Sequence, residues 1–295
     1  MSDTMTDIKK AIVLAAGFGT RFLPMTKAIP KEMLPLVDRP LLHFFVEEIL
    51  EAGVKDIVFV THKNKRAIED YFDRAPELEH FLEERGKHEL ACIVRDIASV
   101  ASFGYVRQKE QKGVADAVLA ARHLIGDEPF AVMSGDDLID AHPSPLKQMA
   151  DVYQKYHAPV TCLMRVPPEK TDKYGIIEGS EVEPGVWKIT RAVEKPAPAE
   201  APTNLATLTR FILTPDFWPY LENVQPVKGE LYIPPAIDAY IKDGHAFYGC
   251  EVKGTWYDCG DKLGYMRAVV DMGLKHPEIG KQFGAWLGEK YRKQG

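Results

Sequence analysis

The chain has 295 residues, of which 45% are hydrophobic and 27% charged, a composition typical of a soluble globular protein with a full core. Its formal net charge of −6 argues against nucleic acid or an anionic membrane as the main partner. The sequence has no run of about 18 apolar residues, so no transmembrane helix is predicted. Residues 1–7 are mostly polar, which predicts a flexible tail rather than a secretory signal.

Strand and helix patterns alternate through the first half of the chain. Residues 11–16 are six consecutive apolar residues, which predicts a central parallel strand covered on both faces. An amphipathic helix at residues 41–52 ends at Gly53. Further strands are predicted at residues 56–61, 105–108 and 130–135, and further helices at residues 65–73, 76–85 and 114–124. Such alternation predicts right-handed βαβ units around a parallel sheet.

The second half of the chain is richer in strand patterns. It predicts strands at residues 159–166, 204–214 and 245–252, a β-hairpin turning at residues 183–185, and a mostly helical stretch at residues 261–292. We therefore expect the α/β class: a single Rossmann-like, three-layer α/β/α domain over residues 8–295. Its central sheet should be mixed but mainly parallel, with a β-hairpin insertion and a helical C-terminal appendage at residues 261–295.

A glycine turn rich in basic residues follows the first strand. Gly17 and Gly19 allow backbone amides to approach a ligand, and Arg21, Lys27 and Lys31 follow closely. The position three after Gly19 is not glycine, which excludes the dinucleotide fingerprint, and no P-loop motif is present. Three cations beside one turn favour a triphosphate ligand over a single phosphate, the alternative being a structural turn with incidental basic residues.

Acidic residues occur in two places that suit a metal ion. Asp136 and Asp137 follow the strand at residues 130–135, and carboxylates at a strand's carboxyl edge are suitable ligands for Mg²⁺, although a solvated turn is equally compatible. Asp258 lies between aromatic residues and Gly260, where we expect partial burial. A shared cation would offset the free-energy cost of burying this carboxylate, and so would a neighbouring arginine or an amide at the start of a helix.

Three weaker motifs suit a sugar and a base. Glu194 and Lys195 follow a predicted strand and should point to opposite faces, the carboxylate toward sugar hydroxyls and the lysine toward a phosphate. Gln108 carries an amide that can pair with the edge of a base. Gly113 directly precedes a helix, where a missing side chain permits close approach. Each motif alone is more often an ordinary surface pair, loop or helix start.

Other site classes are not indicated. The sequence contains no serine–histidine–acid arrangement, no HExxH motif and no catalytic-cysteine context. Its four cysteines have no metal-ligand spacing, which predicts reduced thiols in a cytoplasmic protein.

Several motifs in order carry a resemblance to a known family. The segment LAAGFGTRFLPMTKAIPKEMLPLVD is similar to the signature of the sugar-phosphate nucleotidyltransferases. Its continuation RPLL, with VRQKEQKGVADAV, GDEPFAV, VEKP and DCGDKLGYM, resembles the bacterial UTP–glucose-1-phosphate uridylyltransferases, or UDP-glucose pyrophosphorylases. The resemblance covers nearly the whole chain. It implies formation of UDP-glucose and pyrophosphate from UTP and glucose 1-phosphate, by Mg²⁺-assisted in-line attack on the α-phosphorus without a covalent intermediate.

The resemblance also implies roles for individual residues. Catalytic roles fall on Arg21, Lys31 and Lys195. Nucleotide contacts fall on Ala15, Ala16, Gly17, Gly19, Thr20, Gln108 and Gly113. Sugar contacts fall on Asp137, Gly175, Glu194 and Lys195, and Mg²⁺ ligation on Asp136 and Asp258. A homodimer or homotetramer is implied. The helical C-terminal segment could form the interface, or its apolar stripe could equally well pack on its own domain.

Two departures from the family pattern concern the sugar side. Thr209-Arg210-Phe211 stands where relatives commonly read GRY, and Pro235, in GELYIPPAI, replaces the aspartate of GEIQLTDAI. Two alternatives remain: a thymidylyltransferase of the same fold, or a non-catalytic regulatory paralogue that binds sugar nucleotides. The difference between uridine and thymidine nucleotides is too small for sequence reasoning to decide. Retention of every implied catalytic and metal residue favours catalysis.

Overall fold

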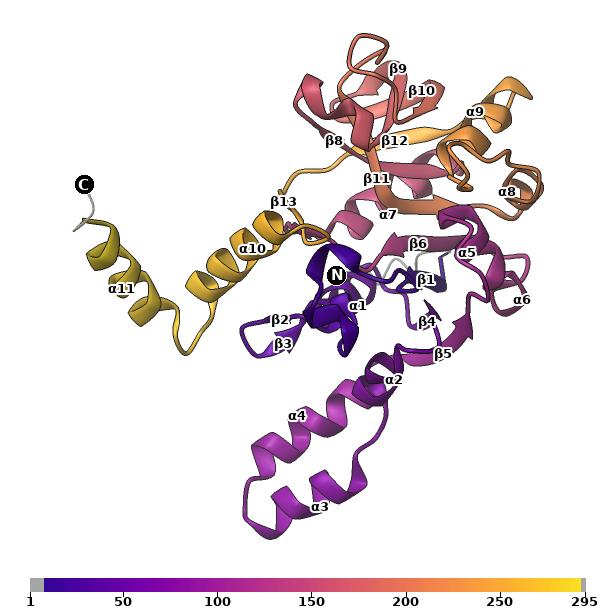
Figure 1. The fold of residues 1–295 in the computed structure, drawn as a ribbon. Helices are drawn as coiled ribbons and strands as arrows, with labels where there is room; N and C mark the ends of the chain where they lie inside the picture. Colours follow the sequence, from indigo (N-terminus) through magenta and orange to yellow (C-terminus); the bar gives the residue numbers. More distant parts are fainter. Residues whose placement is uncertain (1–7, 293–295) are drawn as a thin grey trace.

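A nine-stranded mixed sheet forms the centre of the protein (Figure 1), in a computed structural model that describes residues 8–292. The tail expected at residues 1–7 and the last three residues lie outside the described part. The strand order is β5-β4-β1-β6-β11-β8-β12-β10-β9. The strands are β1 (Lys10–Leu14), β4 (Asp56–Thr61), β5 (Ser102–Arg107), β6 (Phe130–Ser134), β8 (Val160–Arg165), β9 (Gly175–Glu183), β10 (Val186–Glu194), β11 (Leu205–Leu213) and β12 (Tyr248–Glu251).

The sheet is parallel in its first half and mixed in its second. Strands β5, β4, β1 and β6 pair in parallel, whereas β11 runs antiparallel to both β6 and β8. The predicted hairpin is formed by β9 and β10, which pair antiparallel. Two small two-stranded sheets lie outside this sheet, one from β2 (Pro35–Leu36) and β3 (Arg39–Pro40), the other from β7 (Asp137–Asp140) and β13 (Thr255–Asp258).

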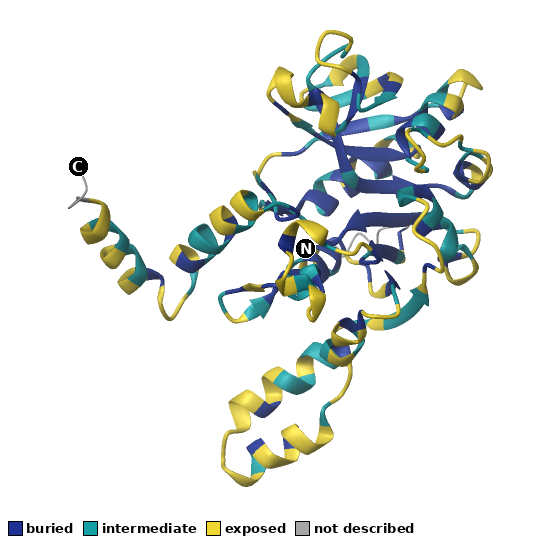
Figure 2. Ribbon diagram, in the orientation of Figure 1, coloured by how far each residue is buried: buried dark blue, intermediate teal, exposed yellow. Residues whose placement is uncertain are grey.

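Both faces of the sheet are covered by helices, as the three-layer prediction requires. Ala11 and Val13 of β1 pack into one apolar cluster and Ile12 into another, because successive strand side chains point to opposite faces. Helices α1 and α7 cover the first face, and α5, α8 and α9 cover the second. Figure 2 shows most of the central strands as buried, whereas the edge strand β5 is half-buried. The expected α/β/α architecture is confirmed.

The helices are α1 (Leu41–Glu51), α2 (Arg66–Phe72), α3 (Pro76–Glu84), α4 (His88–Ser99), α5 (Val114–Ala120), α6 (Arg122–Ile125), α7 (Pro145–Tyr156), α8 (Trp218–Glu222), α9 (Pro234–Lys242), α10 (Lys262–Lys275) and α11 (Gly280–Arg292). Several bounds differ from the predictions. Strand β1 ends at Leu14, so Ala15 and Ala16 lie in the loop after it, and β5 begins three residues earlier than expected. The helix predicted at residues 114–124 is divided into α5 and α6. Helices α4, α7, α8 and α9 and the two small sheets were not predicted.

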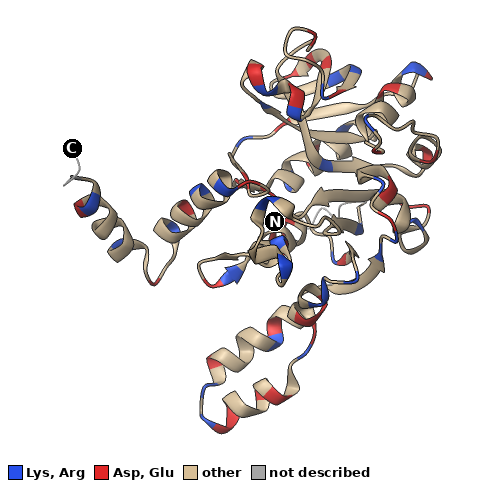
Figure 3. Cartoon of the chain, viewed as in Figure 1, with Lys and Arg blue, Asp and Glu red and all other residues tan. Residues whose placement is uncertain are grey.

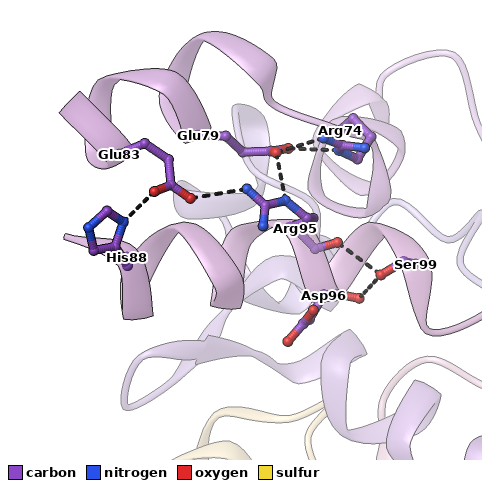
Figure 4. A network of polar contacts seen from close by, with 7 residues as sticks. All are labelled: Arg74, Glu79, Glu83, His88, Arg95, Asp96 and Ser99. Carbon is purple, nitrogen blue, oxygen red and sulfur yellow. Dashed lines mark hydrogen bonds and ion pairs between the residues drawn. The ribbon is translucent and has the colours of Figure 1, made fainter. Parts of the chain in front are cut away.

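A helical hairpin of α3 and α4 projects from the edge of the sheet (Figure 1). An ion network joins its helices (Figure 4): Arg95 of α4 donates to Glu79 and Glu83 of α3, at 3.2 and 3.3 Å. Arg74 donates two further bonds to Glu79, at 2.7 and 2.6 Å, and His88 contacts Glu83. Charges of both signs are spread along this hairpin (Figure 3). These ion pairs therefore link α3 to α4 at the surface of the hairpin.

Helices α10 and α11 extend away from the sheet on another side (Figure 1). The Asp261 side chain caps α10 by accepting hydrogen bonds from the amides of Leu263 and Gly264, at 2.7 and 3.2 Å. Residues 276–279 separate the two helices. Within residues 8–292, none of the helices has the length and apolarity needed to cross a membrane.

Candidate active site

The glycine turn lies directly after β1 and packs against Lys31. Gly19 has φ 65°, a left-handed conformation that favours glycine. A Cβ atom there would also lie 3.2 Å from the Lys31 Cβ, and the Thr26 hydroxyl donates to the Gly19 carbonyl at 2.7 Å. A Cβ on Gly17 would lie 3.9 Å from the Lys31 ammonium. The predicted grouping of turn and lysine is therefore present, with Thr20 beginning a short 3₁₀ turn that includes Arg21.

Lys31 forms an ion pair with Asp136 at the end of β6. Burial disfavours the charged form of Lys31, but the negative charges of Asp136 and Glu32 outweigh it and raise its pKa. Burial likewise opposes ionisation of Asp136, yet Lys31 holds the pKa of that carboxyl below its usual range. The free protein thus carries a fixed positive and a fixed negative charge at this edge of the sheet.

Asp258 brings a second carboxylate to the same place. A Cβ on Gly260 would lie 2.8 Å from Asp136 Oδ2 and 2.9 Å from Asp258 Oδ1, so these two oxygens converge on one space. Arg21 is adjacent, because its Nη1 donates to the Gly260 carbonyl at 3.4 Å. Burial and the nearby Asp136 raise the pKa of Asp258. Residues from three distant parts of the sequence therefore meet at one point.

The convergence of Asp136 and Asp258 fits a hard divalent cation. Among residues 8–292 no group of three or more His, Cys, Asp or Glu side chains is arranged to hold a metal ion. Two carboxylates nevertheless match Mg²⁺, which usually keeps several waters and takes one or two carboxylates plus substrate phosphates. A cation there would offset both the burial and the repulsion by Asp136 that raise the pKa of Asp258.

Asp137 lies next to this point and lines both of the cavities described below. Its carboxylate accepts hydrogen bonds from Ser134 Oγ at 3.0 Å and from Trp256 Nε1 at 3.1 Å. Burial and the charge of Asp136 raise the pKa of Asp137 to about 6. The strand pairing of β7 with β13 sets Asp137 directly opposite Asp258.

Glu194 and Lys195 lie side by side, and the prediction that they point to opposite faces is wrong. Lys195 follows the last residue of β10 and has φ 46°, so the alternation of a strand does not apply to it. Its ammonium lies 3.6 Å from Glu194 Oε1 and donates to Tyr232 Oη at 2.7 Å. Burial, only partly offset by Lys195, raises the pKa of Glu194 to about 7.

Two connected cavities join these groups. The larger, of about 740 Å³, is lined by Arg21, Asp136 and Asp258, and the smaller, of about 210 Å³, by Gly175 and Glu194. Asp137, Lys173, Tyr174, Lys195 and Thr209 line both. Gly175 is required by close packing, since a Cβ there would lie 2.6 Å from Pro234 Cγ. The two departures from the family pattern differ in position: Thr209 lines both cavities, whereas Pro235 lines neither.

The residues predicted to recognise the base lie near the carboxyl ends of β1 and β5, outside both cavity linings. Gln108 donates its amide to the Gly113 carbonyl at 3.2 Å and to Asp116 at 2.7 Å. Gly113 has φ 120°, and a Cβ there would lie 2.5 Å from the Leu231 backbone. Gln111 ties this loop to the end of β1 by donating to the Ala16 carbonyl at 2.6 Å. Close packing against Leu231 therefore explains the glycine at position 113 without reference to a bound base.

Sequence reasoning missed two buried ion pairs beneath the site. Lys65 donates to Glu32 at 2.6 Å directly under the Lys31–Asp136 pair, and Glu32 Oε1 has no partner. Arg210 binds Glu48 with two bonds of 2.9 and 3.0 Å. Glu32 could have been suspected from its place between Lys31 and an apolar run, but nothing in the sequence marks Lys65 or Glu48.

Comparison with known proteins agrees with this geometry. The profile of the nucleotidyl transferase family matches residues 10–273. The chain belongs to this family. Two curated relatives are both named UTP–glucose-1-phosphate uridylyltransferase. The Bacillus subtilis protein is 44% identical over 94% of this chain and 95% of its own length. The Staphylococcus epidermidis protein is 43% identical over 96% and 98%.

Solved structures of similar proteins share the fold. The crystal structure of a UDP-glucose pyrophosphorylase complexed with UDP-glucose is 45% identical, with a TM-score of 0.80 over 89% of this chain and 97% of that one. A UTP-bound enzyme from Acinetobacter baumannii is 38% identical, with a TM-score of 0.88 over 96% and 99%. This nucleotidyltransferase therefore keeps the family fold over nearly its whole length.

Proposed function

We propose that this nucleotidyltransferase transfers a uridylyl group from UTP to glucose 1-phosphate, giving UDP-glucose and pyrophosphate. One observation carries the proposal: Arg21 of the glycine turn lines one end of a cleft together with Asp136 and Asp258, Glu194 lines the other end, and Lys195 lines both. This arrangement supports a triphosphate on one side of the cleft and a sugar phosphate on the other. The names of the curated relatives support the choice of UTP and glucose 1-phosphate.

The reaction needs positioning and charge neutralisation more than covalent chemistry. Arg21 and Lys31 bind the triphosphate of UTP. Lys195 binds the phosphate of the sugar and reduces its charge, so that its oxygen can approach the α-phosphorus in line. A bond forms between that oxygen and the α-phosphorus as the bond to pyrophosphate breaks, with no covalent enzyme intermediate.

The remaining residues fix the orientation of the two substrates. Ala15, Ala16 and Gln108 recognise uracil, Gly113 backs the base, and Gly17, Gly19 and Thr20 bring backbone amides to the phosphates. Asp137, Gly175 and Glu194 contact glucose. Asp136 and Asp258 would hold Mg²⁺, which when bound neutralises phosphate charge. We further propose that residues 8–295 form one domain and that the protein is a cytoplasmic homodimer or homotetramer.

Pyrophosphate release tests this proposal, measured with four nucleoside triphosphates and several sugar 1-phosphates, with and without Mg²⁺. We expect turnover with UTP and glucose 1-phosphate that requires Mg²⁺. A preference for dTTP would replace the proposal with a thymidylyltransferase. Binding of UDP-glucose without turnover of any pair would replace it with a regulatory paralogue.

Variants at the two ends of the cleft test the residue roles. Lys195→Ala and Asp136→Asn should each lower kcat by about 100-fold or more, as expected when electrostatic stabilisation is removed. Lys188→Ala on the exposed side of β10 is a matched control that should keep full activity. Full activity in Lys195→Ala, with an unchanged melting temperature, would remove that role.

A further inference from the structure

Tyr232 holds the ammonium of Lys195 in two ways. Its hydroxyl accepts a hydrogen bond from Lys195 Nζ at 2.7 Å, and the same nitrogen lies 4.1 Å from the centre of its ring. Both side chains line the smaller cavity, and Lys195 also lines the larger one. A lysine side chain is long and flexible, so two contacts at its end restrict where the charge can be.

The backbone of Lys195 is fixed independently of Tyr232. Its amide donates to the Tyr174 carbonyl at 3.0 Å, and its φ of 46° turns the chain at the end of β10. Only the side chain beyond this point is free to choose among rotamers. The contacts of Tyr232 with that side chain are therefore contacts with the mobile end of Lys195.

Tyr232 itself is anchored to the nucleotide side of the site. Its neighbour Leu231 donates to the Lys112 carbonyl at 2.7 Å and accepts from the Ala115 amide at 3.0 Å, on both sides of Gly113. On its other side Tyr232 precedes α9, whose first residue, Pro234, also lines the smaller cavity. The tyrosine is thus held by the loop that carries Gly113 while its side chain reaches Lys195.

We propose that Tyr232 is a positioning residue that presents the Lys195 ammonium to the phosphate of the sugar substrate. This inference rests on the proposed function. On binding, the phosphate accepts another of the three ammonium protons of Lys195, while the hydrogen bond to Tyr232 Oη and the ring contact both remain. Tyr232 thereby favours ligands that bring an anionic phosphate to the mouth of the smaller cavity.

Calorimetric titration with UDP-glucose and with UTP tests the inference without requiring turnover. Tyr232→Phe keeps the ring and should weaken UDP-glucose binding about tenfold, the effect of losing one hydrogen bond to a charged group. Tyr232→Leu should weaken it further, because the ring contact is lost as well. UTP binding should change by no more than about twofold, because Tyr232 acts on Lys195, which the proposed function assigns to the sugar phosphate and not to the triphosphate. Tyr220→Phe is a matched control, since its hydroxyl also contacts a charged group, Asp243, at 2.9 Å, but far from the cavities.

The decisive comparison is made in a Lys195→Ala background. If Tyr232 acts through Lys195, Tyr232→Phe has no further effect on UDP-glucose binding there; a merely structural role would keep its full effect. Equal binding by wild type and Tyr232→Phe, tighter binding by Tyr232→Phe, or an undiminished effect in the Lys195→Ala background would overturn the inference. Absence of UDP-glucose binding to the wild-type protein would instead contradict the proposed function.

Discussion

Arg210 is a charged residue fully enclosed by the core. It is 0% exposed, and Glu48, which it contacts through two hydrogen bonds, is 7% exposed. Glu48 also accepts a bond from the Leu146 amide at 3.1 Å, so this one carboxylate joins β11, α1 and the start of α7. Arg210 adds a stabilising charge near Asp137. The pair thus connects core packing to the wall of the candidate site.

Arg210→Met should lower the free energy of unfolding by about 3–5 kcal/mol, because it leaves the Glu48 carboxylate buried without its partner. Urea unfolding followed by circular dichroism measures this loss. The double variant Arg210→Met/Glu48→Leu should recover part of it, since no buried charge then remains unpaired. A single variant as stable as the wild type would contradict this account of the pair.

Glu194 should make sugar binding depend on pH near neutrality. Its pKa of about 7 means that the carboxylate, which can accept bonds from sugar hydroxyls, forms as the pH rises through 7. We expect the KM for glucose 1-phosphate to fall over that range. The substrate phosphate also titrates near pH 6, and the Glu194→Gln variant separates the two effects, because only the substrate titration persists in it. Identical pH profiles for both proteins would contradict the role of Glu194.

The same carboxyl has the opposite effect on stability. Its pKa in the folded protein, about 7, is above the ordinary value of 4.5, so the folded state binds more protons between these values. Glu194 therefore contributes a free energy of unfolding that falls as the pH rises from about 4.5 to about 7. Under the proposed function, the charged form that carries this cost is the form that accepts hydrogen bonds from the sugar.

At the scale of helices and strands, the sequence predicted those elements whose positions are determined by local residue patterns. The apolar run in β1 and the turn between β9 and β10 were found because strand burial and hairpin turns have local signatures. The pairing of β7 with β13 was missed, since two four-residue strands more than a hundred residues apart carry no local signal. Helix α4 was missed although Leu90, Ile93 and Ile97 recur at helical spacing, so a local signal was present there and was not used.

The same distinction between local patterns and tertiary contacts applies to the candidate site. The glycine turn, Lys31, Asp136 and Asp258 could be predicted to meet, because they lie at the ligand edge of the sheet or match family motifs. The mutual orientation of Glu194 and Lys195 could not, because it depends on one positive φ angle. The Tyr232 contact could not either, since it joins two segments through tertiary packing alone.

The α3–α4 hairpin should loosen when Glu79 loses its charge. Hydrogen bonds from Arg74 and Arg95 keep the pKa of Glu79 below 4.5, so its stabilising effect is present above pH 4.5 and is lost as the pH falls below that value. In Glu79→Gln, amide hydrogen exchange in α3 and α4 should become faster at neutral pH while exchange in the central strands does not change. Glu84→Gln, at an exposed His80 pair on the same helix, is the matched control. Unchanged exchange in the hairpin would show that apolar contacts hold it instead.

At the scale of the whole molecule, α10 and α11 leave large apolar side chains in solvent. The side chains more than two-fifths exposed are Leu263, Met266, Leu274, Ile279, Trp286 and Tyr291. Figure 2 shows this arm as largely exposed or half-buried beside the buried sheet. Exposed apolar surface of this kind marks interaction sites. The helical arm is therefore where the proposed self-association is most easily tested.

Trp286→Glu should lower the oligomeric state measured by size-exclusion chromatography with light scattering. Trp286 is 51% exposed and stacks on Phe283, so a charge there would face any apolar partner surface while leaving the sheet untouched. Phe81→Glu on α3, at a residue that is 45% exposed, is the matched control and should leave assembly unchanged. Dissociation by Phe81→Glu but not by Trp286→Glu would move the interface to the helical hairpin. Monomeric wild-type protein would remove the proposed oligomer altogether, and pyrophosphate release by that monomer would show that the active site is complete within one chain.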